Sequence, residues 1–211
     1  MISNIPTDRF NLLDKKNAKI FYKKNGYVIL KNFYSKDVLQ DFKNEVVNII
    51  NSYLIKAKLK TIETSQERVL TDGIAQLEKL DHEYVAAVYD TIFQSPSFLR
   101  ISGDKSSEDL IKYLLDLDIE KNSLYAHTNR CRNDPPRDNR RTYGWHQEIF
   151  YTIPKSEFIQ TWGPVIRDIT IENGGIEICI GSHKEGIARQ TFNKDPNNPT
   201  PFTIENQIID K

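Results

Sequence analysis

The two halves of this chain carry different residue patterns, and this division limits the folds that it can adopt. Residues 1–120 hold apolar residues at spacings of three and four, which is the period of an amphipathic helix. From residue 122 onward the segments become short and rich in β-branched and aromatic residues, and six of the nine glycines lie between Gly144 and Gly186. A helical part followed by a part made of strands indicates an α+β fold.

Capping residues delimit the helices that we expect in the first half. A helix over 14–24 can end at Gly26, because glycine adopts the left-handed conformation of a C-terminal cap. Ser35 can begin a longer helix whose apolar positions continue to Leu54, and a further helix is expected from Asp81. The other expected features are a strand over 27–30, a polar connection over 56–68, a helix stop at Ser95-Pro96-Ser97 and a turn set at 110–115 after a cap at 106–107.

Strands are expected in the second half, where they would form a sandwich or a barrel backed by the helices. Their predicted ranges are 124–132, 143–153, 158–169 and 175–180. Four or five strands leave an unpaired edge, so we expect either that the helices cover this edge or that the chain is incomplete. We treat residues 1–211 as a single domain, mainly helical to residue 120 and made of strands from residue 121.

Composition excludes several classes of protein. The 29 basic and 29 acidic residues balance, which argues against nucleic acid as a partner. The longest apolar run, residues 84–89, is far too short to cross a membrane. Cys131 and Cys179 are too few for a disulfide framework, so we expect free thiols and a cytoplasmic location.

Residues 144–151 contain the best candidate for a metal site. On a strand, residues two apart point to the same face, so the His146 imidazole and the Glu148 carboxylate can converge on one ion. One histidine and one carboxylate, with a second histidine from elsewhere, form the facial triad of non-haem Fe(II) oxygenases. A strand with two solvated polar residues fits the same pattern. We expect His82 to be a solvated residue and His127 to be structural.

An arginine-rich loop precedes this segment. Residues 130–141 contain five of the ten arginines, together with Asp134 and Asp138. A solvated loop with internal ion pairs is one interpretation. The other is that Arg130 and Arg132 bind a carboxylate or phosphate of the substrate, because the planar guanidinium group pairs well with both.

Three motifs in a fixed order point to a family. Residues 21–33 read FYKKNGYVILKNF before a helix, residues 145–148 read WHQE, and residues 171–186 read IENGGIEICIGSHKEG. In this order they resemble the N-terminal signature, the metal-binding strand and the Asn-Gly and Gly-Ser-His-Lys turns of the phytanoyl-CoA dioxygenase family of Fe(II)/2-oxoglutarate oxygenases. The resemblance spans nearly the whole chain.

This resemblance implies a double-stranded β-helix, a cupin-like jelly roll, that binds Fe(II) and 2-oxoglutarate and hydroxylates or otherwise oxidises a small substrate, which the arginine-rich loop suggests is anionic. His146 and Glu148 correspond to the first two metal ligands. It also suggests Trp162, and next to the ligands Gln147, as cofactor contacts. Tyr151 is a candidate substrate contact together with the two arginines named above.

The chain departs from the family pattern at several points. Glu148 stands where the family usually has aspartate, and the histidine at position 183 lies in a turn that does not coordinate metal in the family. No histidine follows His183 and no arginine follows Arg189, where the third ligand and the 2-oxoglutarate-binding arginine would lie. We therefore expect a fold that is incomplete at its C-terminus, with weak Fe(II) binding and little succinate formation. The alternative is a non-catalytic binding module that keeps the fold.

Overall fold

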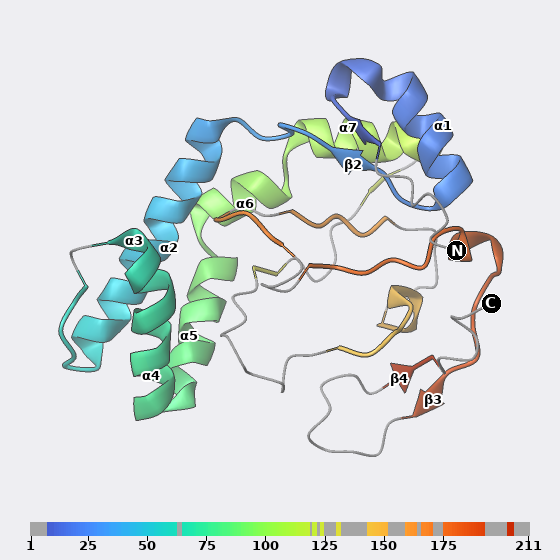
Figure 1. Ribbon diagram of the computed structural model, residues 1–211. Coiled ribbons are helices and arrows are strands. Elements are labelled where there is room, and N and C mark those ends of the chain that lie inside the picture. The colour runs from blue at the N-terminus through green and yellow to red at the C-terminus, as the bar shows by residue number, and fades with distance from the viewer. Residues whose placement is uncertain are drawn as a thin grey trace.

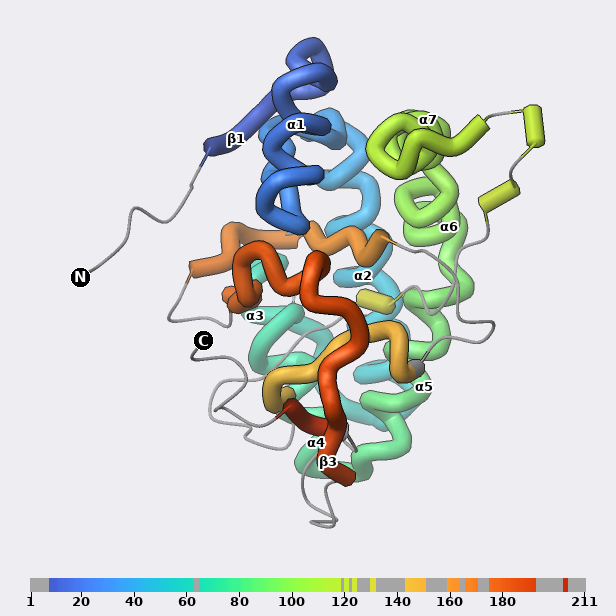
Figure 2. Tube along the Cα trace, turned by 90° about the vertical axis from the view of Figure 1, so that its right-hand side faces the viewer, coloured from blue at the N-terminus to red at the C-terminus, as the bar shows by residue number. Residues whose placement is uncertain are grey.

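Helices make up most of the described first half of the protein, and the described second half lies against one side of them (Figures 1 and 2). The computed structural model describes residues 8–62, 65–118, 120–121, 123–124, 130–131, 143–151, 159–163, 166–170, 175–192 and 202–204, without the side chains of Tyr151 and Phe202. None of the helices in this part of the chain is long and apolar enough to span a membrane.

The helices follow one another with short connections. In chain order they are the 3-10 helix η1 (Leu12–Asp14), α1 (Lys15–Asn25), α2 (Lys36–Lys56), α3 (Gln66–Arg68), the π-helix η2 (Val69–Gly73), α4 (Ile74–Leu80), α5 (His82–Phe93), α6 (Pro96–Ser102) and α7 (Lys105–Leu114). Figure 1 places α2, α4 and α5 side by side, with α1 and α7 together at one end.

Two of the predicted caps are confirmed. The Ser35 hydroxyl accepts a hydrogen bond of 3.3 Å from the Val38 amide at the start of α2. Gly26 ends α1 with φ of 84°, and its amide donates to the Tyr22 carbonyl at 2.8 Å.

Other predictions about the first half were wrong or incomplete. Residues 66–80 are helical throughout, although part of this range was expected to be a polar connection. Ser95 begins α6 by accepting a bond from the Phe98 amide, so the serine and the proline after it start a helix as well as ending one. The cap of α7 is Asp104, whose side chain accepts from the Ser107 amide at 3.0 Å.

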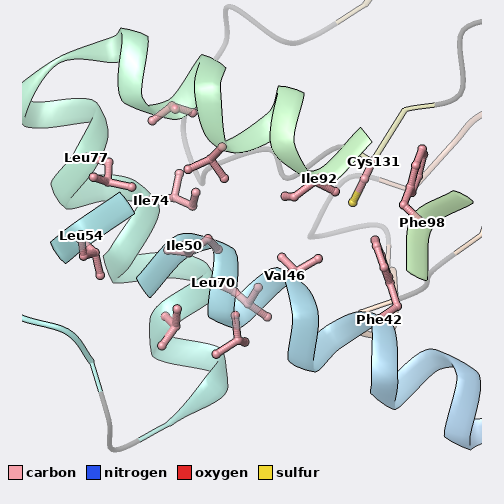
Figure 3. Close-up of a cluster of buried hydrophobic side chains, with 14 of the residues drawn as sticks. Phe42, Val46, Ile50, Leu54, Leu70, Ile74, Leu77, Ile92, Phe98 and Cys131 are labelled. Atoms are coloured by element: carbon pink, nitrogen blue, oxygen red, sulfur yellow. The ribbon is translucent and has the colours of Figure 1, made fainter. Parts of the chain in front are cut away.

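The hydrophobic core lies between α2 and the helices from η2 to α6 (Figure 3). The apolar face of α2 supplies its largest members, and Phe42, Ile50 and Leu54 are almost completely buried. Burying each such side chain stabilises the fold by about 1.5–3 kcal/mol before the loss of chain entropy is counted. This packing holds the helices together, and the rest of the chain lies against them.

The second half is attached to this core at defined points. Cys131 is 7% exposed and lies in the cluster near Ile92 and Phe98 (Figure 3). Ile166 packs against the same cluster, and Arg167 donates to the Glu67 carboxylate at 3.1 Å. The helical core therefore holds the chain on both sides of the candidate metal segment.

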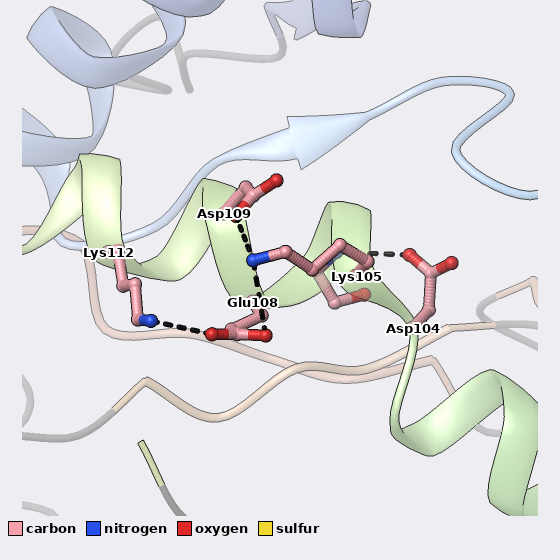
Figure 4. Close-up of polar contacts among 6 residues, drawn as sticks. Asp104, Lys105, Glu108, Asp109 and Lys112 are labelled. Carbon is pink, nitrogen blue, oxygen red and sulfur yellow. Dashed lines mark hydrogen bonds and ion pairs between the residues drawn. The ribbon is translucent and has the colours of Figure 1, made fainter. Parts of the chain in front are cut away.

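A row of ion pairs lies along α7 (Figure 4). Lys105 binds Asp109 at 2.7 Å and Glu108 at 3.4 Å, and Lys112 binds Glu108 at 2.5 Å. The last pair matters most, because Lys112 is only 7% exposed and its ammonium group needs an anionic partner. These pairs bring the pKa values of both carboxyl groups below their ordinary values, chiefly through hydrogen bonds from the lysines.

The jelly roll predicted for the second half is not confirmed by the described residues. They contain two small sheets, in which β1 (Arg9–Phe10) pairs in parallel with β2 (Ile29–Leu30), and β3 (Thr191–Phe192) pairs antiparallel with β4 (Phe202–Thr203). The strand expected over 27–30 is thus confirmed in part.

The strands predicted around the metal segment differ most from the structure. Glu148–Tyr151 is a 3-10 helix, η4, in place of the second half of the predicted strand 143–153. The described parts of the predicted strands 158–169 and 175–180 form no ladder. Ile176, Ile178 and Ile180 alternate as in a strand, but each is 41–51% exposed. Alternation identifies a common face, whereas a strand also needs a hydrogen-bonded partner, which the alternation does not specify.

The two thiols should differ in reactivity. Both cysteines are free, and burial raises the pKa of Cys131 to about 11, while Cys179 is partly exposed. At pH 8 only about one Cys131 in a thousand would be a thiolate. We predict that a thiol reagent modifies Cys179 in the native protein and Cys131 only after unfolding, and that Cys179→Ser abolishes the native reaction. Rapid native labelling of the Cys179→Ser variant would contradict the packing of Cys131 in the core.

Candidate functional site

The segment that carries the candidate metal ligands is bonded to two other parts of the chain. The Trp145 carbonyl accepts from the Ile204 amide at 2.8 Å, and a side chain at Gly144 would lie 3.1 Å from the Thr203 methyl group. The Gln147 amide group donates to the Gly186 carbonyl at 3.0 Å and accepts from the Ala188 amide at 2.9 Å. Residue 146 lies between Trp145 and Gln147, so the bonds of these two neighbours hold its backbone in place.

His146 is oriented by its own backbone. Its Nδ1 lies 2.7 Å from the Gly144 carbonyl oxygen, which can only accept, so Nδ1 carries the proton and donates. Its Nε2 lies 3.2 Å from Oε1 of Glu148. Nε2 can therefore hold either a second proton or, through its lone pair, a cation shared with the carboxylate. Histidine ligands of metals are commonly oriented in this way, by a bond from the second ring nitrogen to a carbonyl.

His146 and Glu148 thus lie together as predicted, but the local structure at Glu148 is a 3-10 helix and not the predicted strand. Glu148 begins η4, in which the Phe150 amide donates to the Gln147 carbonyl at 3.2 Å. Both side chains are partly accessible, His146 at 21% and Glu148 at 30% exposed. The pair is sheltered and still open to a ligand.

The electrostatics of the pair favour the charged forms. The hydrogen bond with Glu148 raises the pKa of His146, although desolvation opposes this shift. The bond with His146 lowers the pKa of Glu148, and a hydrogen bond from Gln160 and the positive charge of Arg130 add to that effect. An ionised carboxylate is the form that binds metal ions.

The distance within the pair fits a shared metal ion. Two ligand atoms at about 2.1 Å from an ion, at a right angle to each other, lie about 3.0 Å apart. The 3.2 Å between Nε2 and Oε1 is close to this value. Within the described residues, no third histidine, cysteine or carboxylate lies with these two, and His127 falls outside them. Two ligands with an oriented imidazole are therefore what this part of the chain offers.

The other predicted site residues fall into three groups. Arg130 is exposed and close enough to Glu148 to influence its pKa. Trp162 is 53% exposed, and the Gln147 amide is used in the backbone bonds described above. Arg132 and the side chain of Tyr151 lie outside the described residues. Roles in cofactor or substrate binding stay predictions for all of these residues.

Sequence reasoning did not identify Gln160 as part of this site. Its side chain bonds to Glu148 from a different segment of the chain, 12 positions further along. Gln160 lies in the predicted strand 158–169, and a glutamine in a strand carries no pattern that distinguishes it from a solvated residue. Only the fold brings it to the carboxylate.

His183 has a structural contact, as its turn motif suggested. It belongs to the 3-10 helix η6 (Ser182–Lys184), and its Nε2 lies 3.1 Å from the Lys23 carbonyl at the end of α1. The Gly181 amide donates to the Asn25 carbonyl at 2.9 Å. The imidazole lies so close to Gly26 that an added Cβ there would be 2.4 Å from Nδ1. The turn thus satisfies carbonyl groups at the helix end, which have no partner within the helix.

A comparison with models of known families identifies the family of the chain. The family model described as phytanoyl-CoA dioxygenase matches residues 22–207, a range that includes the last four residues of α1, the His146–Glu148 pair and the η6 turn. No solved structure matches the chain.

Replacement of Gly26 tests the contact between η6 and α1. Gly26→Ala should lower the free energy of unfolding by about 2–4 kcal/mol, because the new side chain meets the His183 ring and adopts a left-handed conformation. Gly186→Ala is the matched control, since Gly186 has φ of +75° and open space around it, and it should cost only about 1–2 kcal/mol. Urea denaturation measures both. Equal losses would show that His183 does not lie against Gly26.

Proposed function

The chain belongs to the phytanoyl-CoA dioxygenase family, and on this basis we propose that it is an Fe(II)- and 2-oxoglutarate-dependent hydroxylase. Members of this family are oxygenases that typically use these two cofactors. The observation that carries the proposal is the His146–Glu148 pair, with Nδ1 bonded to the Gly144 carbonyl and Nε2 facing the carboxylate. His146 Nε2 and a Glu148 oxygen would hold the iron.

Bound iron and 2-oxoglutarate supply the oxidising power, since O₂ converts a substrate C–H bond to C–OH while 2-oxoglutarate becomes succinate and CO₂. The protein contributes position and charge. The Gly144 carbonyl holds a proton on Nδ1, so Nε2 is the nitrogen that would bind the metal, after releasing the proton that the contact with Glu148 favours. Together with His146, Gln160 and Arg130 keep Glu148 ionised. The bonds of Gln147 to Gly186 and Ala188 hold the segment that carries His146 and Glu148.

We further propose that the substrate is a small anion. Arg130 lies near the pair and would attract a carboxylate or phosphate, with Arg132 as a second donor. Trp162 and Gln147 are proposed as contacts of 2-oxoglutarate, and Tyr151 as a contact of substrate. The proposals for Gln147 and Tyr151 rest on their position beside the two ligands in the sequence, and that for Trp162 rests on the resemblance to the family.

The alternative is a binding module without a metal. It is favoured by one observation, the lack of a third metal-ligating side chain near the pair among the described residues. The two functions differ in whether the pair binds Fe(II) at all, so direct metal binding distinguishes them.

Calorimetry under anaerobic conditions tests the proposal with the full chain. We predict that Fe(II) binds in the presence of 2-oxoglutarate, and that His146→Ala and Glu148→Gln each lower the affinity at least about 10-fold. The matched controls are His82→Ala, whose side chain is 80% exposed on α5, and Glu185→Gln on the exposed end of the η6 turn; both should bind like the parent protein. Binding that is absent in the parent protein, or equally strong in all four variants, would contradict the proposal.

A further inference from the structure

A second candidate site lies between α1 and α7, away from the His146–Glu148 pair. It is an open hollow of about 620 Å³. Its lining is dominated by lysines, namely Lys16, Lys19, Lys23, Lys24 and Lys184. The chain as a whole has no net charge, so five lysines in one hollow are a local concentration of positive charge.

The fold of α1 explains four of these lysines. Lys16, Lys19 and Lys23 lie three and four positions apart and Lys24 follows directly, while the opposite face of the helix buries Ala18 and Phe21. Positions at this spacing share one helix face, so the lysines gather on the face that is turned away from the buried residues.

The fifth lysine comes from the other end of the chain. Lys184 belongs to η6, which the bonds from His183 to the Lys23 carbonyl and from Gly181 to the Asn25 carbonyl attach to the end of α1. Figure 2 shows this segment beside the lower end of α1. The contact brings Lys184 to the hollow across 160 residues of sequence.

One acidic residue, Asp116, offsets part of the positive charge of the hollow. The Asp116 carboxylate binds Lys23 at 3.0 Å and also pairs with Lys19, and hydrogen bonds from these lysines lower its pKa. Within the described part of the chain, Lys16, Lys24 and Lys184 have no ion pair. The hollow thus keeps an excess of four positive charges, five lysines against one aspartate.

Apolar surface lies next to the lysines. The Tyr113 ring lines the hollow and is 37% exposed, with the Lys19 ammonium 4.4 Å from its centre. Ile20, which is 59% exposed, lies between the lysines on α1. The hollow therefore offers ammonium groups for an anion and a ring and a hydrocarbon chain for an uncharged part of the same molecule.

We propose that this hollow binds the phosphate groups of a phosphorylated ligand. Lysine ammonium groups act as mobile point charges that suit multiply charged phosphates. Multiply charged phosphate groups occur as free phosphate in solution, as the diphosphate of small molecules, and in the headgroups of lipids. The site does not depend on the iron chemistry proposed above, because its residues are separate from His146 and Glu148.

Titration with inorganic pyrophosphate tests the binding of free phosphate. We predict that the parent chain binds it, that added salt weakens the binding, and that Lys23→Ala/Lys184→Ala lowers the affinity about 10- to 30-fold. Lys36→Ala/Lys79→Ala is the control of equal charge change, since both lysines are exposed and lie outside the hollow; it should leave the affinity unchanged.

Vesicles test the lipid source. They would contain phosphatidylcholine with or without a phosphoinositide, and co-sedimentation measures the bound protein. If a lipid headgroup is the ligand, the phosphoinositide vesicles bind the parent chain, pyrophosphate binds weakly, and Leu13→Ser reduces vesicle binding because Leu13 is 98% exposed near the start of α1. Binding to either probe that the hollow variant loses and the control variant keeps supports the proposal. Binding to neither probe, or equal losses in the two lysine pairs, would overturn it.

Discussion

The apolar face of α2 is the contact on which the rest of this structure depends. Phe42, Ile50 and Leu54 on that face are buried by the helices that follow, and this produces one continuous core. The described second half has little regular structure of its own, and it reaches this core through Cys131 and Ile166. Because Arg130 is the neighbour of Cys131, the helical packing also positions a cation near Glu148.

The candidate site depends in turn on one backbone carbonyl. Gly144 accepts the bond from His146 Nδ1, and this leaves Nε2 directed at the Glu148 carboxylate. The Gln147 bonds to Gly186 and Ala188 attach the same segment to the chain that follows η6. Since η6 also brings Lys184 to the end of α1, one short turn links the metal pair to the lysine-rich hollow.

The sequence predicted the features that depend on local order. The Ser35 and Gly26 caps and the α2 stripe follow from residues within one or two turns, and the three motifs in their order identified the family. Prediction from the sequence failed where the local structure depends on contacts with distant residues. The alternating isoleucines at 176–180 marked a common face but could not supply the neighbouring strand, and η4 replaced the strand expected at Glu148.

Contacts between distant segments explain other misses. Gln160 reaches Glu148, and Lys184 reaches α1, only because the fold brings their segments together. No helix was predicted over 66–80, and this miss has a local reason: the first positions are polar, so the apolar positions begin only at Val69.

Diffraction at the iron absorption edge, from crystals of the chain loaded with Fe(II) without oxygen, tests the central claim most directly. We predict an anomalous peak about 2.0–2.2 Å from both His146 Nε2 and a Glu148 carboxylate oxygen, with Nδ1 still bonded to Gly144. Iron bound elsewhere, with Nε2 and the carboxylate still in direct contact, would contradict it.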